Sequence, residues 1–175
     1  MKVQENGFTL LECLITIAIL AIVSGVALSN FSSIITHQRL DNAMFRLYKA
    51  LQFSRTYAVT NGFHTTFCPL VDGICQKQWQ NTLYVFEDLN MNLSLDEGEA
   101  ILKVIKPISS LDSLSYPRTA VTYRRDGSIR FMQSGSFLYC NEELYLSKGN
   151  RLTVSQVGRI RIRDSERCPN TNLHK

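Results

Sequence analysis

The sequence lacks the motifs from which common enzyme active sites are built. It has three histidines, and it contains no G-x-S-x-G nucleophile turn, no glycine-rich phosphate loop and no G-x-G-x-x-G dinucleotide fingerprint. No C-x-x-C pair occurs, which argues against a structural zinc site. There are no repeats and no low-complexity linker. These absences favour a non-enzymatic protein with no resident cofactor.

Charge is also scarce near the N-terminus. Between residues 8 and 28 the only ionisable side chains are those of Glu12 and Cys13, and Cys13 is expected to be a small buried side chain. This run is about long enough to cross a bilayer as a helix. A secretory signal peptide carries its small-residue cleavage site after such a run, whereas here Gly7 precedes it. Cleavage after Gly7 would leave the apolar helix on the mature protein.

The segment Gly7-Phe8-Thr9-Leu10-Leu11-Glu12 resembles the start of type IV pilins, whose leader ends in Gly followed by Phe-Thr-Leu-x-Glu. The resemblance implies that residues 1–7 are a prepilin leader and that a prepilin peptidase cleaves after Gly7 and N-methylates Phe8. It also implies a role for Glu12 in subunit docking, because a carboxylate within an apolar helix is costly and usually functional. Ser29 stands where many major pilins have a kinking Pro, a departure that minor pilins tolerate.

Four further cysteines lie in the globular part: Cys68, Cys75, Cys140 and Cys168. An even set beyond a membrane segment suggests two disulfides in an oxidising compartment, with free buried thiols as the alternative. Cys68 and Cys75 enclose a short turn that would bring them together, which would leave Cys140 to pair with Cys168. The other two pairings stay open from the sequence.

Two arguments about orientation disagree. Lys2 is the only cation of the leader, whereas four cations follow the apolar run at Arg39, Arg46, Lys49 and Arg55, so the positive-inside rule would keep the C-terminal domain in the cytoplasm. The cysteines and the pilin resemblance indicate the opposite. We expect a single pass through the bacterial inner membrane with the C-terminal domain in the periplasm, and an extracellular pilus fibre after assembly.

The fold predicted from the pattern is α+β and pilin-like, a long N-terminal helix packed on an antiparallel β-sheet. Residues 8–28 form the transmembrane or filament-core half of the helix, 29–61 its amphipathic half and 62–175 a β-rich globular domain. Asn61-Gly62 is expected to end the helix. Turn signals at 125–128 and 148–150 predict hairpins. The predicted strands are Thr65–Pro69, Thr82–Glu87, Ala100–Ile105, Ala120–Tyr123, Ser128–Met132, Phe137–Cys140, Arg151–Ser155 and Arg159–Arg163.

A second resemblance covers the globular part and is to the FimT/GspH family of minor pilins and pseudopilins. Its residues are Trp79, Val85-Phe86-Glu87-Asp88, Asn90, Asp96, Gly98-Glu99, Leu102, Arg125-Asp126-Gly127-Ser128, Gly135-Ser136-Phe137, Cys140, Val154-Ser155 and Gly158-Arg159-Ile160-Arg161. The resemblance implies a minor pilin of a type IV pilus that packs against other pilins or pseudopilins through residues 8–60 and acts in assembly or the tip complex. A GspH-like pseudopilin of a type II secretion system is an alternative.

One loop has the spacing of a calcium site. Oxygen-bearing side chains fall at positions 1, 3, 5, 7, 9 and 12 of residues 88–99, the spacing of an EF-hand loop. Leu93 occupies the sixth position, where the EF-hand turn has Gly. The alternative is a polar turn whose side chains bond their own backbone. The candidate calcium ligands are Asp88, Asn90, Asn92, Asp96 and Glu99.

Basic residues gather in the last third of the chain. Residues 1–115 have 8 Lys/Arg against 10 Asp/Glu (−2), and residues 116–175 have 11 against 5 (+6). Alternation puts Arg159, Arg161 and Arg163 on one strand face, about 6.6–6.8 Å apart, with Ile160 and Ile162 toward the core, and Arg151 is close in sequence. In the family that the chain resembles, a C-terminal Gly-Arg-x-Arg segment is associated with DNA capture in natural transformation. Double-stranded DNA is therefore a candidate partner, and a solvated edge strand is the alternative.

Overall fold

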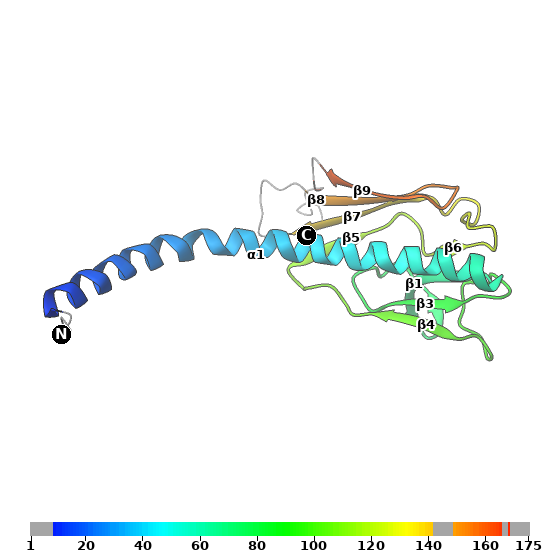
Figure 1. The fold of residues 1–175 in the computed structure, drawn as a ribbon. Coiled ribbons are helices and arrows are strands. Elements are labelled where there is room, and N and C mark those ends of the chain that lie inside the picture. Colours follow the sequence, from blue (N-terminus) through cyan, green and yellow to red (C-terminus); the bar gives the residue numbers. More distant parts are fainter. Residues whose placement is uncertain (1–8, 142–148, 166–167, 169–175) are drawn as a thin grey trace, which may run out of the picture. The chain divides into compact units, whose positions relative to one another are not determined.

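The computed structural model describes residues 9–141, 149–165 and 168, without the side chains of 26–33, 36, 164 and 165. The chain forms two compact units, Met1–Arg39 and Leu40–Lys175. A single helix, α1 (Leu10–Asn61), contributes residues to both units. In the described part of the chain, the strands that follow α1 are all antiparallel, so the fold is α+β as predicted (Figure 1).

Within the Leu40–Lys175 unit, α1 buries one stripe of apolar side chains. Leu40, Met44, Leu47 and Leu51 recur every three or four residues, and each is at most 2% exposed. The helix ends at Asn61, where Gly62 adopts a left-handed conformation (φ 69°) and its N–H donates to the carbonyl of Ala58 at 3.0 Å. This is the glycine termination that the sequence predicts. Figure 1 shows this half of α1 running alongside both sheets.

Two antiparallel sheets cover the helix. The first has strand order β2-β1-β3-β4, with β6 also paired to β1, and the second has order β5-β7-β8-β9. Among the described strands, β4 and β9 are sheet edges. The bounds of the first sheet are β1 Thr65–Val71, β2 Ile74–Cys75, β3 Leu83–Glu87, β4 Ile101–Ile105 and β6 Val121–Tyr123. Those of the second are β5 Asp112–Ser115, β7 Gly135–Asn141, β8 Gly149–Val154 and β9 Ile160–Ser165.

An aromatic cluster joins the two sheets in the core. Phe67 of β1 and Phe137 of β7 lie with ring centroids 6.2 Å apart, and Trp79 lies edge-on to Phe137 at 4.9 Å. Tyr116 stacks on Phe137 at 4.1 Å. The indole N–H of Trp79 donates to the carbonyl of Arg118 at 2.9 Å, so this large buried ring leaves no donor unsatisfied.

The structure corrects some of the predicted elements. Ser128–Met132 is not a strand: Ile129 makes only an isolated bridge to Tyr123, and Met132 has a left-handed φ of 62° that ends any extension. Two strands were missed. The two-residue β2 is too short to show a pattern, and β5 has the polar sequence Asp-Ser-Leu-Ser, which does not read as a strand.

One of the two predicted hairpin turns is present, and the described residues of the other belong to a strand. At 125–128, Gly127 has φ 76° and the N–H of Arg124 donates to the carbonyl of Ser128 at 2.8 Å. At 148–150, by contrast, Gly149 and Asn150 lie inside β8, where they pair with Ser165 and Asp164 of β9. Lys148 itself lies outside the described residues.

Candidate functional site

The N-terminal part of α1 presents apolar side chains on every side. From Leu10 to Val23 the large apolar side chains have exposed fractions between 50% and 81%. A helix that is apolar all round needs a surrounding of lipid or of other helices. Within the described residues, no helix combines the length and hydropathy needed to cross a membrane. The assignment of residues 8–28 as a transmembrane segment stays a prediction.

Glu12 lies in a capping box at the start of α1. Its carboxylate accepts hydrogen bonds from the backbone N–H and the hydroxyl of Thr9, at 3.1 and 3.3 Å, and the N–H of Glu12 donates to the Thr9 hydroxyl at 3.3 Å. This reciprocal Thr-x-x-Glu pairing satisfies free N–H groups of the first helical turn, and an acidic group is favourable at that helix end. The signal was present in the sequence and was overlooked there.

The predicted cleavage after Gly7 and the predicted burial of Cys13 have different outcomes. Gly7 and Phe8 lie outside the described residues, so cleavage and methylation stay predictions. Cys13 is a free cysteine and is exposed, so the expectation of a buried thiol is wrong for the single chain.

Both disulfides of the favoured pairing are present. Cys68 and Cys75 are bonded with their Cα atoms 5.6 Å apart, which closes the turn between β1 and β2. Cys140 of β7 is bonded to Cys168, with a Cα separation of 5.9 Å. The second bond attaches the chain after β9 to the middle of its own sheet.

The predicted arginine strand is an exposed sheet edge. The side chains of Arg161 and Arg163 on β9 are exposed, and Arg159 is exposed in the turn that precedes the strand. Ile160 is 8% exposed as expected, but Ile162 is 42% exposed, so only one of the two isoleucines is buried. Ile162 pairs with the buried Leu152, and it remains open because β9 has a neighbour on one side only.

Strand pairing brings Arg151 into this surface. Arg151 of β8 is the direct partner of Arg163, so two guanidinium groups project side by side from the same face of the sheet. Cross-strand pairs of like charge are destabilising, which makes this face suited to an anion. Arg161 pairs with Thr153, whose hydroxyl is hydrogen-bonded to that of Ser136 at 2.9 Å. We call Arg151, Arg159, Arg161 and Arg163 the β9 arginine surface.

In the candidate calcium loop, Asp88 serves the sheet. Its side chain is fully buried and accepts a hydrogen bond from the hydroxyl of Thr66 at 2.6 Å, and that hydroxyl also contacts the hydroxyl of Thr122 at 2.7 Å. The other carboxylate oxygen of Asp88 accepts from the N–H of Asn92 at 3.0 Å. The first of the five candidate ligands is therefore committed to holding the loop on β1.

The remaining candidates bind one another. The side-chain amides of Asn90 and Asn92 both donate to one carboxylate oxygen of Asp96, each at 2.8 Å. Glu99 accepts from the N–H of Leu89 at 2.8 Å and from that of Asp96 at 3.0 Å. Among the described residues no group of three or more His, Cys, Asp or Glu is arranged to hold a metal. These bonds match the polar-turn interpretation and leave calcium binding as the less favoured alternative.

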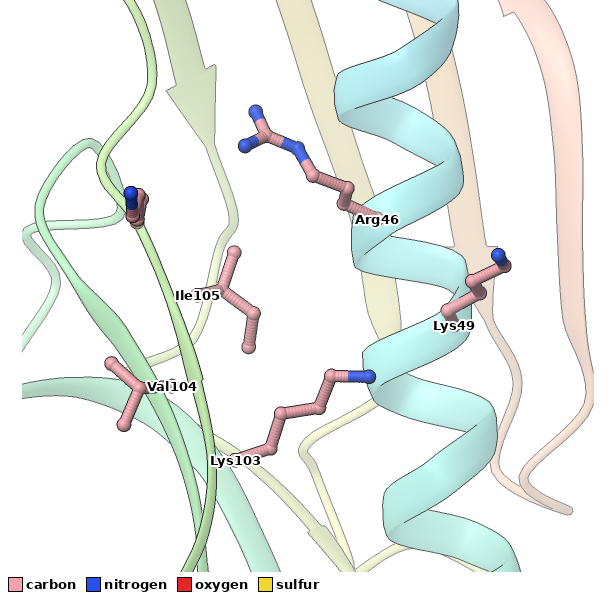
Figure 2. Close-up of a pocket in the computed structure, with 6 residues that line it drawn as sticks. Arg46, Lys49, Lys103, Val104 and Ile105 are labelled. Carbon is pink, nitrogen blue, oxygen red and sulfur yellow. The ribbon is translucent and has the colours of Figure 1, made fainter.

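A cluster of cations that the sequence did not reveal lines a groove between α1 and β4 (Figure 2). Arg46 and Lys49 come from α1, and Lys103 and Lys106 come from β4 and the residue after it. The sequence separates the two pairs by more than fifty residues. The spacing of Arg46 and Lys49 marks one exposed helix face, but no local pattern predicts that β4 lies beside it.

Comparison with known proteins identifies the chain's relatives. The family model for the type II transport protein GspH matches residues 43–158, and the prokaryotic N-terminal methylation motif matches residues 3–28. A search of curated protein sequences finds no significant match.

Solved structures share the fold. The type IV minor pilin FimU of Pseudomonas aeruginosa is 21% identical in two crystal forms, with TM-scores of 0.60 and 0.57. These matches cover 77% and 75% of this chain and 96% and 98% of FimU. The minor pseudopilin EpsH from the type 2 secretion system of Vibrio cholerae is 13% identical, with a TM-score of 0.52 over 72% of this chain and 97% of EpsH.

Proposed function

The chain belongs to the GspH family of type II transport proteins, and from that membership we propose that it is a minor pilin, a structural subunit without enzymatic activity. The observation that carries the proposal is the helix from Leu10 to Val23, which is apolar on every side and lies within the match to the methylation motif. Such a helix suits a subunit held first in the inner membrane and then among the helices of neighbouring subunits. The globular domain would lie in the periplasm, and in the extracellular fibre after assembly.

The first test is processing by a prepilin peptidase. Intact-mass analysis of the protein from its native membrane should show the loss of residues 1–7 and one added methyl group on Phe8. An N-terminus that still begins at Met1 in cells with an active peptidase would overturn the proposal.

The second test separates the two roles of Glu12. Glutamine also satisfies the capping box, so Glu12→Gln keeps the helix start and removes the charge, whereas Glu12→Ala removes both. If the carboxylate acts in subunit docking, both variants are cleaved and both fail to enter sheared filaments. Assembly of Glu12→Gln at the wild-type level would show that Glu12 acts through capping alone.

The choice between a type IV pilus and a type II secretion system needs a comparison in cells. We favour the pilus, in which the chain would be a scarce subunit acting in assembly or in the tip complex. A deletion strain should then lose surface pili and keep export of its type II substrates. Loss of export with normal piliation would make the chain a pseudopilin of the secretion system.

A second candidate function is capture of double-stranded DNA for natural transformation. The observation that favours it is the β9 arginine surface, where Arg151 of β8 and Arg163 of the edge strand β9 are adjacent like charges with exposed side chains. Each guanidinium can contact a phosphate bidentately, and the described residues of this surface lie on strands and a turn, which offer no helix for base readout. We expect weak binding without sequence preference, with a Kd of about 10⁻⁴–10⁻⁶ M at physiological salt.

A mobility-shift titration at low salt tests this candidate. The double variant Arg159→Gln/Arg161→Gln should bind DNA more weakly than the parent and remain folded, because both side chains are exposed. The matched control is Arg46→Gln on α1, which should bind like the parent. Equal binding by the parent and the double variant would leave Arg159 and Arg161 as part of a solvated edge that resists strand pairing.

A further inference from the structure

Cationic residues predominate among those that line the groove between α1 and β4. It has a volume of 230 Å³ and is lined by Arg46, Lys49, Lys103, Val104, Ile105 and Lys106. Four of these six residues are cations and none is acidic. Figure 2 shows the amine of Lys103 reaching from β4 toward α1 and the side chain of Val104 turned the other way. We call this site the α1–β4 groove.

Two of the lysines are held in position by aromatic rings. The Nζ atom of Lys49 lies 4.4 Å from the centroid of the Phe45 ring, and that of Lys103 lies 5.5 Å from the centroid of the Phe53 ring. Such contacts attract the ammonium group to the ring face and contribute about 0.5–1 kcal/mol at an exposed site. They bias the positions of the two lysines, and because each ammonium carries three N–H donors, donors remain that can bond an anionic group.

Exposed apolar side chains and an open sheet edge lie on the two elements that form the groove. Val104 is 55% exposed and Ile101 is 48% exposed on β4, and Phe45 is 50% exposed on α1. Among the described strands β4 pairs with β3 alone, so its outer edge offers free backbone N–H and C=O groups. A phosphate backbone complements neither feature. An extended polypeptide complements both, by adding a strand to the edge and covering the apolar side chains.

We propose that the α1–β4 groove binds an acidic, extended segment of another subunit in the same filament. The segment adds along β4, and because strand side chains alternate, every second residue faces α1. Acidic residues at those positions meet Arg46, Lys49 and Lys103, and apolar residues at the others cover Val104. This inference rests on the proposed function as a filament subunit and assigns one of its contacts.

The binding test uses the full-length chain in neutral detergent and a fluorescent ten-residue peptide in which Glu and Val alternate. The variant Lys49→Glu/Lys103→Glu should lower the affinity at least about tenfold, because a repulsive charge replaces each attractive one. The matched control Arg161→Glu/Arg163→Glu changes the net charge equally on the β9 arginine surface, and it should stay within about twofold of the parent. Thermal unfolding of each variant checks that it is folded.

Three results would overturn the inference. The parent could fail to bind the peptide, or both double variants could lose affinity equally, which would make the effect one of net charge. In the third result, Lys49→Glu/Lys103→Glu would lose binding of a 20-base-pair DNA duplex and still bind the peptide, which would identify the groove as a nucleic-acid site.

A photo-crosslinker at Val104 tests the same contact in cells. The crosslinked partner, identified by mass spectrometry, should be a chain with its own N-terminal methylation motif, joined through an acidic peptide, and Lys49→Glu/Lys103→Glu should abolish the product. Lys77→Glu changes an exposed position outside the groove lining, and it should leave the crosslinked product in place. If the processed subunit enters filaments without this crosslink, the groove inference fails alone. If it is neither cleaved nor found in filaments, the proposed function fails.

Discussion

Replacing Gly158 with alanine should strongly destabilise the globular domain. Gly158 lies in the turn from β8 to β9, where its N–H donates to the carbonyl of Ser155 at 2.8 Å. Its φ is 76°, in the left-handed region that favours glycine. A Cβ atom at this position would lie 2.0 Å from the carbonyl oxygen of Gly127 and 3.2 Å from Nε of Arg55. The glycine of the Gly-Arg-x-Arg segment is therefore required by backbone packing.

Two costs add to give the magnitude. An alanine in the left-handed region costs about 1–2 kcal/mol. Overpacking costs about 1–3 kcal/mol more, because a Cβ at 2.0 Å from Gly127 O needs backbone, and not a flexible side chain, to move. Gly158→Ala should thus lower the free energy of unfolding by about 2–5 kcal/mol. At about 4 °C per kcal/mol for a domain of this size, the Tm should fall by about 8–20 °C.

Gly62→Ala is the matched control for the backbone cost. Gly62 has a similar φ of 69°, and a Cβ there would meet nothing within 4 Å. Gly62→Ala should therefore lose stability only through the cost of placing alanine in the left-handed region. Both variants and the parent are compared as full-length chains in the same detergent by thermal and urea unfolding. Equal losses for Gly62→Ala and Gly158→Ala would refute the argument that the Gly127 backbone excludes a side chain at position 158.

The remaining predictions concern the disulfides, pH and calcium. Replacing both Cys140 and Cys168 with serine should lower the free energy of unfolding by about 3.6 kcal/mol, and replacing both Cys68 and Cys75 should lower it by about 2.4 kcal/mol. The difference arises because the bonded cysteines are 28 and 7 residues apart. Urea unfolding that shows the reverse order would contradict the loop-entropy argument. Burial, and after it the positive charges of Arg125 and Arg124, lowers the pKa of His64 below its usual value of about 6.5. The unfolded chain then binds that proton more readily, so stability should fall as the pH drops below about 6.5. His64→Gln should flatten the change in Tm between pH 7.5 and 5.5, and an unchanged slope would show that His64 is not its source. Adding 1 mM calcium or excess EDTA should leave the Tm unchanged. The side-chain oxygens of the 88–99 loop already accept hydrogen bonds from within the loop and from β1. A clear rise of the Tm with calcium would instead establish the metal site.

Local signals in the sequence were enough to predict the elements that depend on local chemistry. Asn61-Gly62 marks the helix end because glycine alone adopts the left-handed cap at little cost. The alternation from Ile160 to Arg163 marks β9 because the side chains of a strand point to opposite faces. The short turn at Asp72-Gly73 indicates the Cys68–Cys75 bond, and both of its residues do have positive φ.

Features that depend on which strands meet were not predictable in this way. Ile162 has the alternation of a core residue, and its exposure follows from the edge position of β9, which no local pattern specifies. The pairing of Arg151 with Arg163 is set by the register between β8 and β9. The α1–β4 groove likewise exists because two distant segments pack side by side. Long-range register, and not residue type, decides each of these cases.

The apolar surface of the helix from Leu10 to Val23 has a consequence for the energetics of assembly. If the subunit leaves a bilayer to join a filament, the helix moves from one apolar solvent to another, since lipid tails are as apolar as leucine side chains. The hydrophobic effect then contributes almost equally before and after the transfer and cannot drive it. The direction of assembly would depend on the few interactions that differ between the two states, such as the charge of Glu12 and the contacts of the globular domains. For such a subunit the apolar helix would set no preference between membrane and filament, so both growth and return of subunits would depend on those other interactions.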